Sequence, residues 1–191
     1  MKEIKYKEKI KRCKLSLIFL LLVIFGILCG RYFIKENSFD CSILSIFSYR
    51  VFSGDFISCL NYSLLPVCVY LIFGFFCSVS VFGFILLPCE CFFIGLSLFY
   101  SCYEAWLIIG NKIFLVYLPF WAAYTAFLIE YIKNCFKVSL RLFTGFVNNK
   151  KTEELKIIFR ENIKKFYSAM LVSLIFTFFL VFIGFGVNLK I

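Results

Sequence analysis

The sequence predicts an all-α polytopic membrane protein with about five transmembrane helices. Three observations support this prediction. Residues 56–89 carry no charged side chain, and this run is too long for one crossing, since a bilayer core of ~30 Å needs about 20 apolar residues. Hydrophobic side chains make up 62% of the 191 residues and aromatic ones 21%, which exceeds what a water-soluble domain of this size can cover. The Lys and Arg residues stand beside apolar runs, as in the cytoplasmic flanks of membrane spans.

The apolar runs place five spans in one integral membrane domain, residues 1–191. They cover about residues 15–34, 59–81, 82–103, 113–131 and 166–189. The longest polar segment, residues 148–165, is too short to bury a core of its own. Phe82, Gly83 and Phe84 mark a tight reversal between the second and third spans. Pro66, Pro88 and Pro119 lie inside spans, where each frees a backbone carbonyl that a neighbouring helix or water must satisfy.

The first span follows a short basic segment, the same order as in a signal peptide. The small-x-small cleavage pattern is missing, so we expect an uncleaved helix. This span carries Gly26 and Gly30 four residues apart, a spacing that lets another backbone approach closely. Ala122 and Ala126 give the fourth span a similar small-residue face. We expect these four residues to serve helix packing.

The distribution of cations sets the predicted orientation. Seven cations precede the first span and nine lie between the fourth and fifth spans, whereas the other connections carry four: Arg31, Lys35, Arg50 and Lys112. Because short cytoplasmic loops carry the excess of Lys and Arg, the amino terminus is expected inside and the carboxyl terminus outside.

Residues 133–165, which include the polar segment 148–165, form a longer basic region. Lys133, Lys137 and Arg141 recur every four residues, which stacks them on one helix face. This pattern predicts amphipathic cytoplasmic helices between spans four and five, with these three cations on an anionic membrane surface. A solvated loop with scattered charge is the alternative.

Glu90 is the acid that lies well inside a predicted span, and intramembrane acids are costly and often functional. It could bind a cation, relay a proton or anchor a polar helix. It could equally be a structural residue that reaches the headgroups from the inner end of its helix. Both interpretations stay open.

No catalytic constellation is present in the sequence. It has no histidine, and therefore no HExxH motif, and it has no GxSxG motif and no phosphate-binding glycine loop. The ten cysteines form no CxxC pair and are expected to be buried as small hydrophobes, although Cys41 and Cys59 could pair on the outer side. We therefore expect no enzyme, no cofactor and no metal site. The net charge of +10 is explained by membrane flanks, so no nucleic acid is expected as a partner.

Three groups of residues resemble a known family. They are the hairpin with Gly74, Gly83-Phe84-Ile85-Leu86-Leu87-Pro88 and Phe93-Ile94-Gly95-Leu96; the pair Leu118-Pro119; and the segment Val138-Ser139-Leu140-Arg141-Leu142. In this layout the chain resembles the stage II sporulation protein M family. The resemblance implies a non-catalytic scaffold of the bacterial cytoplasmic membrane. Such a scaffold helps to position peptidoglycan-degrading proteins while the mother-cell membrane engulfs the forespore.

The partners expected from this interpretation are the lipid bilayer and other membrane or exported proteins, with peptidoglycan hydrolases among the candidates. A homo-oligomer is left open. The alternative function is a small membrane transporter or permease subunit that uses Glu90, since interrupted helices often line binding sites. A third interpretation is a protein that binds lipid through its basic cytoplasmic helices.

Overall fold

The computed structural model describes residues 2–36, 56–80, 82–109, 111–147 and 152–188. This part of the chain is all-helical, as the sequence predicts, and consists of five helices: α1 (Lys2–Glu36), α2 (Phe56–Val79), α3 (Gly83–Ile109), α4 (Asn111–Val147) and α5 (Thr152–Asn188). The predicted first outer connection, with Cys41, lies outside the described residues.

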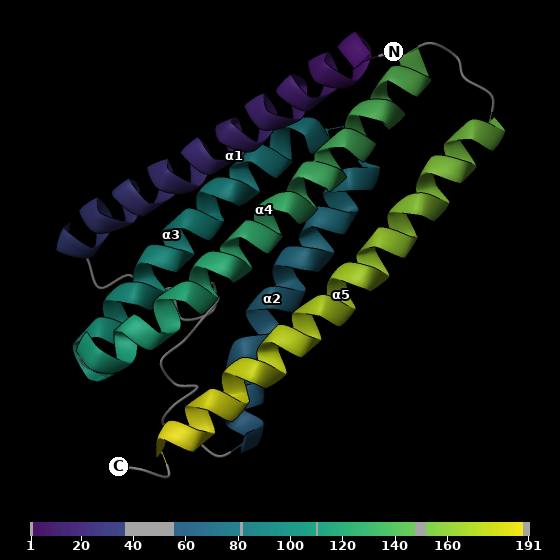
Figure 1. The fold of residues 1–191 in the computed structure, drawn as a ribbon. Helices are drawn as coiled ribbons and strands as arrows, with labels where there is room; N and C mark the ends of the chain where they lie inside the picture. Colours follow the sequence, from purple (N-terminus) through teal and green to yellow (C-terminus); the bar gives the residue numbers. More distant parts are fainter. Residues whose placement is uncertain (1, 37–55, 81, 110, 148–151, 189–191) are drawn as a thin grey trace.

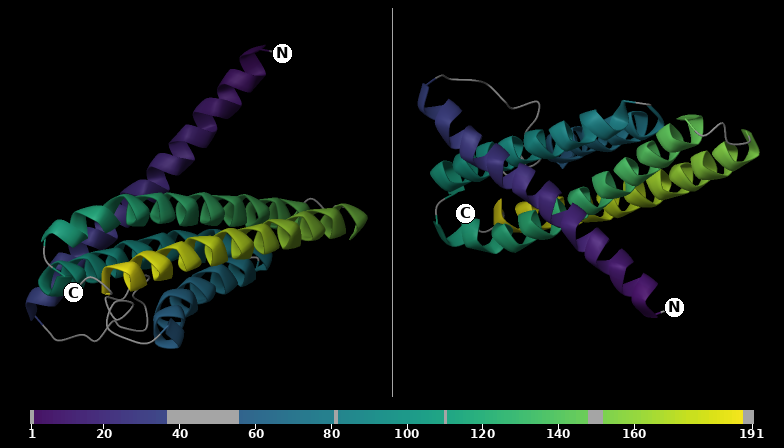
Figure 2. Two further views of the ribbon diagram at one scale, coloured as in Figure 1. Left: turned by 60° about the horizontal axis from the view of Figure 1, so that its bottom comes forward. Right: turned by 90° about the horizontal axis from the view of Figure 1, so that it is seen from above.

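The helices alternate in direction through the bundle (Figure 1). α1 packs mainly against α3 and touches α4 at its edge, whereas α2 packs against α3, α4 and α5. The amino terminus lies at the same end as the end of α4 and the start of α5, and the carboxyl terminus lies at the opposite end (Figure 1). α1 crosses the other helices obliquely, and its amino-terminal part extends away from them (Figure 2).

A tight turn joins α2 to α3, at the reversal that the sequence predicts. The Gly83 backbone N–H donates to the Ser80 carbonyl at 3.1 Å, and the Ser139 hydroxyl of α4 donates to the same carbonyl at 3.1 Å. A Cβ atom at Gly83 would overlap the Cys77 carbonyl. Glycine is therefore required here by the close approach of two backbone segments.

The core is built from apolar side chains of all five helices. Its fully buried members include Phe19 and Val23 from α1, Leu71 from α2, Leu87, Cys91 and Ile94 from α3, Tyr124, Leu128 and Ile132 from α4, and Val181 from α5. Aromatic rings extend this core, and Phe127 stacks on Phe176 between α4 and α5 with ring centroids 6.4 Å apart.

Two of the described helices are long and apolar enough to cross a membrane by length and composition. Their spans are Lys14–Tyr32 and Gly83–Tyr103, and a shorter apolar stretch covers Leu64–Val79. The five crossings stay a prediction.

The structure corrects the expectation of separate amphipathic helices between the fourth and fifth spans. α4 continues without a break to Val147, and α5 begins at Thr152, so the basic segments are extensions of these two long helices. Residues 132–144 contain neither Gly nor Pro, so nothing interrupts the backbone hydrogen bonds that α4 has already begun. The extensions reach beyond the α2–α3 turn (Figure 2, left).

Candidate functional site

Glu90 lies in the interior of the bundle, on α3. It is 2% exposed, and neither carboxyl oxygen has a hydrogen-bond partner among the described residues. Its carboxyl group faces α2 at Gly74, where a Cβ atom would lie 3.3 Å from Oε2 and 3.4 Å from Oε1. The missing side chain of Gly74 therefore leaves the space that the carboxyl group occupies.

Tyr131 of α4 packs against the same glycine. A Cβ atom at Gly74 would lie 2.9 Å from Cε1 of Tyr131, and the Tyr131 hydroxyl donates to the Leu71 carbonyl of α2 at 2.8 Å. Glu90 thus belongs to a junction of α2, α3 and α4. A carboxylate in such surroundings is costly unless it takes up a proton or a cation, and this is the chemistry that the junction supports.

Among the described residues, the surroundings of Glu90 do not form a metal centre built from protein side chains. Within the described ranges, no group of three or more His, Cys, Asp or Glu side chains is placed to hold a metal ion. The nearby thiols of Cys77, Cys91 and Cys135 are free and buried.

A second buried polar contact ties α5 to α2. The Asn162 amide donates to the Ser78 hydroxyl at 2.6 Å, and Ser78 in turn donates to the Phe75 carbonyl at 2.6 Å. Asn162 is 3% exposed and Ser78 is 0% exposed. Sequence reasoning missed this pair, although a signal was present: Asn162 interrupts the apolar stripe of its helix, three residues after Phe159 and four before Phe166.

The prediction that Lys133 lies on a basic membrane-surface face is wrong. This side chain is buried, and its ammonium group pairs with Glu130 and donates to the Ser16 hydroxyl of α1 at 3.1 Å. Arg141 is exposed and Lys137 is half-buried. A step of four residues rotates about 40° around an α-helix, so the first and third cations point about 80° apart and only the later one faces outward.

The glycines expected to serve helix packing lie on the face of α1 that meets α3. A Cβ atom at Gly26 would overlap the Phe92 carbonyl oxygen, and one at Gly30 would lie 3.0 Å from the Phe99 ring. From the other side, a Cβ atom at Gly95 of α3 would overlap the Val23 carbonyl. The two backbones therefore approach closely, as small residues permit.

Ala122 and Ala126, the other residues expected at a helix contact, are exposed. Among the described helices they lie on the outer face of α4, away from the buried core. The opposite face of α4 enters the core, because Tyr124, Thr125 and Leu128 are the buried residues of this stretch.

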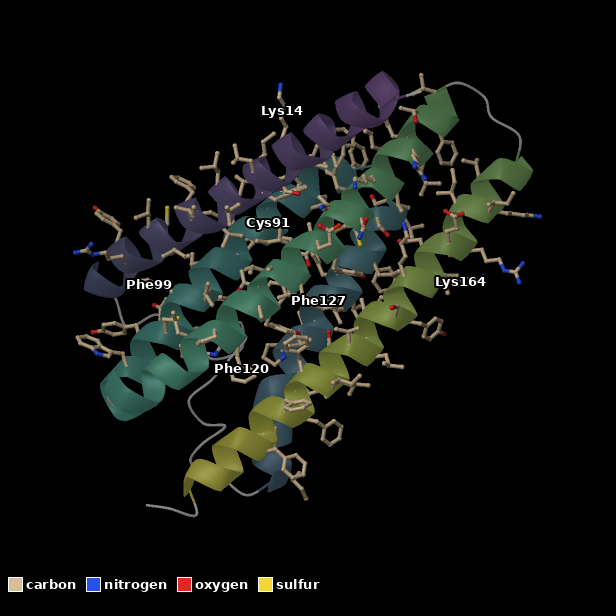
Figure 3. The ribbon with its side chains drawn as sticks, in the orientation of Figure 1. Lys14, Cys91, Phe99, Phe120, Phe127 and Lys164 are labelled. Atoms are coloured by element: carbon tan, nitrogen blue, oxygen red, sulfur yellow. The ribbon has the colours of Figure 1, made fainter. Side chains whose placement is uncertain are left out.

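A cavity of about 180 Å³ lies between α4 and α5. It is lined by Phe127, Glu130, Tyr131, Asn134, Cys135, Asn162, Lys165, Ser168 and Ala169. Its floor is buried and its rim is exposed, since Tyr131, Cys135 and Asn162 are buried whereas Glu130, Lys165 and Ser168 are exposed. Phe127 is labelled beside this region in Figure 3.

An open groove of about 600 Å³ lies near the end of the bundle where α4 ends and α5 begins; we call it the end groove. It is lined by Val79, Leu142, Phe146, Leu155, Lys156, Phe159, Arg160 and Ile163. Its walls are apolar, and its two cations, Lys156 and Arg160, are exposed.

Three comparisons of this chain, with protein-family models, with curated proteins and with solved structures, find no match.

Proposed function

We propose that the chain is a five-crossing integral protein of the bacterial cytoplasmic membrane. Large apolar side chains are exposed along the helices, among them Leu17, Leu21 and Phe25 on α1, Phe73 and Phe76 on α2, and Leu171, Ile175, Phe179 and Phe182 on α5. Water-soluble monomers rarely expose apolar surface on this scale. A bilayer would cover these side chains without a partner protein.

The alternating helix directions support the proposed orientation. The basic amino terminus, the α2–α3 turn, the end of α4 and the start of α5 lie at one end of the bundle (Figure 1). In residues 2–14 and 156–165, which lie at that end, Lys and Arg outnumber the acidic residues, and an excess of Lys and Arg marks the cytoplasmic side of a membrane.

We infer that the protein acts as a non-catalytic membrane scaffold that organises a membrane and cell-wall remodelling complex. The observation that carries this inference is the helical hairpin formed by the last part of α4 and the first part of α5. Each helix has 37 residues, a length of about 55 Å, whereas a bilayer core needs only ~30 Å. Both helices therefore have enough length to cross the membrane and to project into the cytoplasm.

The end groove on this hairpin supplies the binding chemistry. Its apolar walls suit an apolar helix face, as in other complexes where an amphipathic helix lies in a groove, and Lys156 and Arg160 favour acidic side chains along the edge of that helix. The expected cytoplasmic occupant is an amphipathic acidic segment of a partner protein. The resemblance to the stage II sporulation protein M family extends this proposal to exported peptidoglycan hydrolases on the outer side.

The experiment is a crosslinked, affinity-tagged purification from native membranes, with the captured proteins identified by mass spectrometry. The wild type is compared with Arg160→Glu and with Lys164→Glu, a matched change one turn along α5 at an exposed residue outside the groove. We expect the wild type and Lys164→Glu to capture the same partner, which contains an acidic amphipathic segment, and Arg160→Glu to lose it. Equal capture by all three chains would contradict the proposal.

Glu90 favours a second candidate function, a small transporter or permease subunit. Its buried carboxyl group, without a hydrogen-bond partner in the described part of the chain, offers a place for a proton or a small cation to bind. Flux into liposomes tests this candidate with Glu90→Gln. Transport predicts flux in the wild type and its loss in the variant, whereas the scaffold predicts no flux and unchanged partner capture in both.

A further inference from the structure

The cavity between α4 and α5 combines a buried polar floor with a charged rim. On the floor, Asn162 is held in place by its hydrogen bond to Ser78. On the rim, the ammonium group of Lys165 and the hydroxyl of Ser168 are exposed, and the amide of Asn134 lies beside them in the same lining. Besides Asn162, the side chains of Asn134, Lys165 and Ser168 thus bring three groups able to donate hydrogen bonds to one small space.

The charges on the rim leave one cation unneutralised. The Glu130 carboxylate pairs with Lys133, so it does not neutralise Lys165. Within the part of the chain that the structure describes, Lys165 forms no ion pair of its own. An anion that enters the cavity would therefore meet the ammonium group of Lys165, the neutral donors, and a Glu130 carboxylate whose charge is balanced by Lys133.

In the proposed arrangement, the cavity lies near the cytoplasmic surface of the bilayer. The predicted fourth span ends at residue 131 and the predicted fifth span begins at residue 166, and the lining contains Tyr131 and Lys165. The cavity is thus at the level of the headgroups of the cytoplasmic leaflet. Phe127 lines it one turn further toward the bilayer centre, where acyl chains begin.

We propose that this cavity binds the phosphodiester group of a phospholipid from the cytoplasmic leaflet. The Lys165 ammonium pairs with the phosphate oxygens, Asn134 and Ser168 donate hydrogen bonds to them, and the acyl chains follow the apolar surface past Phe127. Charge-assisted hydrogen bonds of this kind are stronger than neutral ones. The inference rests on the proposed crossing of the bilayer and is independent of the partner that the scaffold holds.

The test is native mass spectrometry of the full chain purified in detergent from membranes that contain phosphatidylglycerol. Wild type is compared with Lys165→Gln and with Lys164→Gln, a matched control at the exposed neighbouring residue, which Figure 3 labels on α5. We expect wild type and the control to retain one phospholipid, and Lys165→Gln to retain about tenfold less, the loss expected for one charge-assisted contact. Equal retention by both variants would overturn the proposal.

If Lys165→Gln unfolds, a second variant tests the same site. Ser168→Trp fills the exposed rim without changing a charge and should also lose the lipid. Retention of the lipid by a folded Ser168→Trp chain would place it elsewhere and overturn the proposal.

A titration separates a lipid from a free phosphate ion. The delipidated chain is heated with short-chain phosphatidylglycerol or with inorganic phosphate, because a ligand that binds the folded state raises the midpoint of unfolding. We expect the lipid to raise the midpoint in the wild type but not in Lys165→Gln, and phosphate alone to leave it unchanged. Equal stabilisation by phosphate would overturn the assignment to a lipid. Partner capture is measured separately, so a failure of the scaffold would be recognised as a different result.

Discussion

Asn162 of α5 and Ser78 of α2 share a hydrogen bond of 2.6 Å between two side chains that are almost completely buried. The bond fixes α5 to α2 close to the α2–α3 turn. It also holds one side of the α4–α5 cavity. The polar contacts of this end of the bundle therefore support both the hairpin and the cavity that the proposals use.

Replacing Asn162 with Ala should lower the free energy of unfolding by about 1–2 kcal/mol, because a buried hydrogen bond and its packing are lost. Thermal unfolding in detergent measures the effect. Glu161→Ala, at the exposed neighbouring residue, is the control and should change stability by less than about 0.5 kcal/mol. Equal midpoints for the two variants would show that the Asn162–Ser78 bond does not stabilise the bundle.

Replacing Gly26 with Leu should separate α1 from α3. The new side chain would overlap the Phe92 carbonyl and crowd Gly95, and overpacking costs about 1–3 kcal/mol. Limited proteolysis of α1 in detergent measures this loss of packing. Leu21→Phe enlarges an exposed residue of the same helix and should leave α1 protected; faster cleavage in both variants, or in neither, would contradict the tight crossing.

Replacing Lys133 with Glu should destabilise the contact between α1 and α4 by about 1–3 kcal/mol, because two carboxylates would then meet at a partly buried site. The double variant Glu130→Lys/Lys133→Glu restores opposite charges and should recover most of the loss. Thermal unfolding of the single and double variants provides the comparison. A double variant no more stable than the single one would argue against an ion pair between these positions.

The proposed five crossings place the carboxyl terminus outside. A carboxyl-terminal alkaline phosphatase fusion should therefore be active, and a green fluorescent protein fusion at the same point should be dark. Labelling of Lys156→Cys by a membrane-impermeant thiol reagent, in a variant lacking the natural cysteines, should require opened cells. A fluorescent carboxyl-terminal fusion would place the carboxyl terminus in the cytoplasm and contradict this topology.

The helical class and the α2–α3 reversal could be predicted because both depend on local pattern. Uncharged apolar runs indicate helices, and Gly83 occupies a turn where a side chain would overlap the Cys77 carbonyl. The outcome for residues 133–147 was different. The same amphipathic pattern fits a separate surface helix and an extension of the preceding one, and only the absence of a helix breaker before Gly145 distinguishes them.

The candidate sites depend on which helices meet, and a single sequence does not specify this pairing. The residues Gly26 and Glu90 attract notice as a small residue and an acid in apolar runs, but nothing local indicates that they face Phe92 and Gly74. Lys133 shows the same limit, because a four-residue period does not reveal which of its members faces the core.

The most direct test of the scaffold is a photo-crosslinking amino acid placed in the end groove, at Phe159, in cells that express the full chain. The same crosslinker at Tyr167, an exposed residue of α5 inside the predicted fifth span, is the control. We predict that Phe159 crosslinks to one protein through an acidic amphipathic segment, that Arg160→Glu abolishes this product, and that Tyr167 crosslinks to lipid. Lipid-only products at Phe159, or a protein product that Arg160→Glu does not change, would contradict the account.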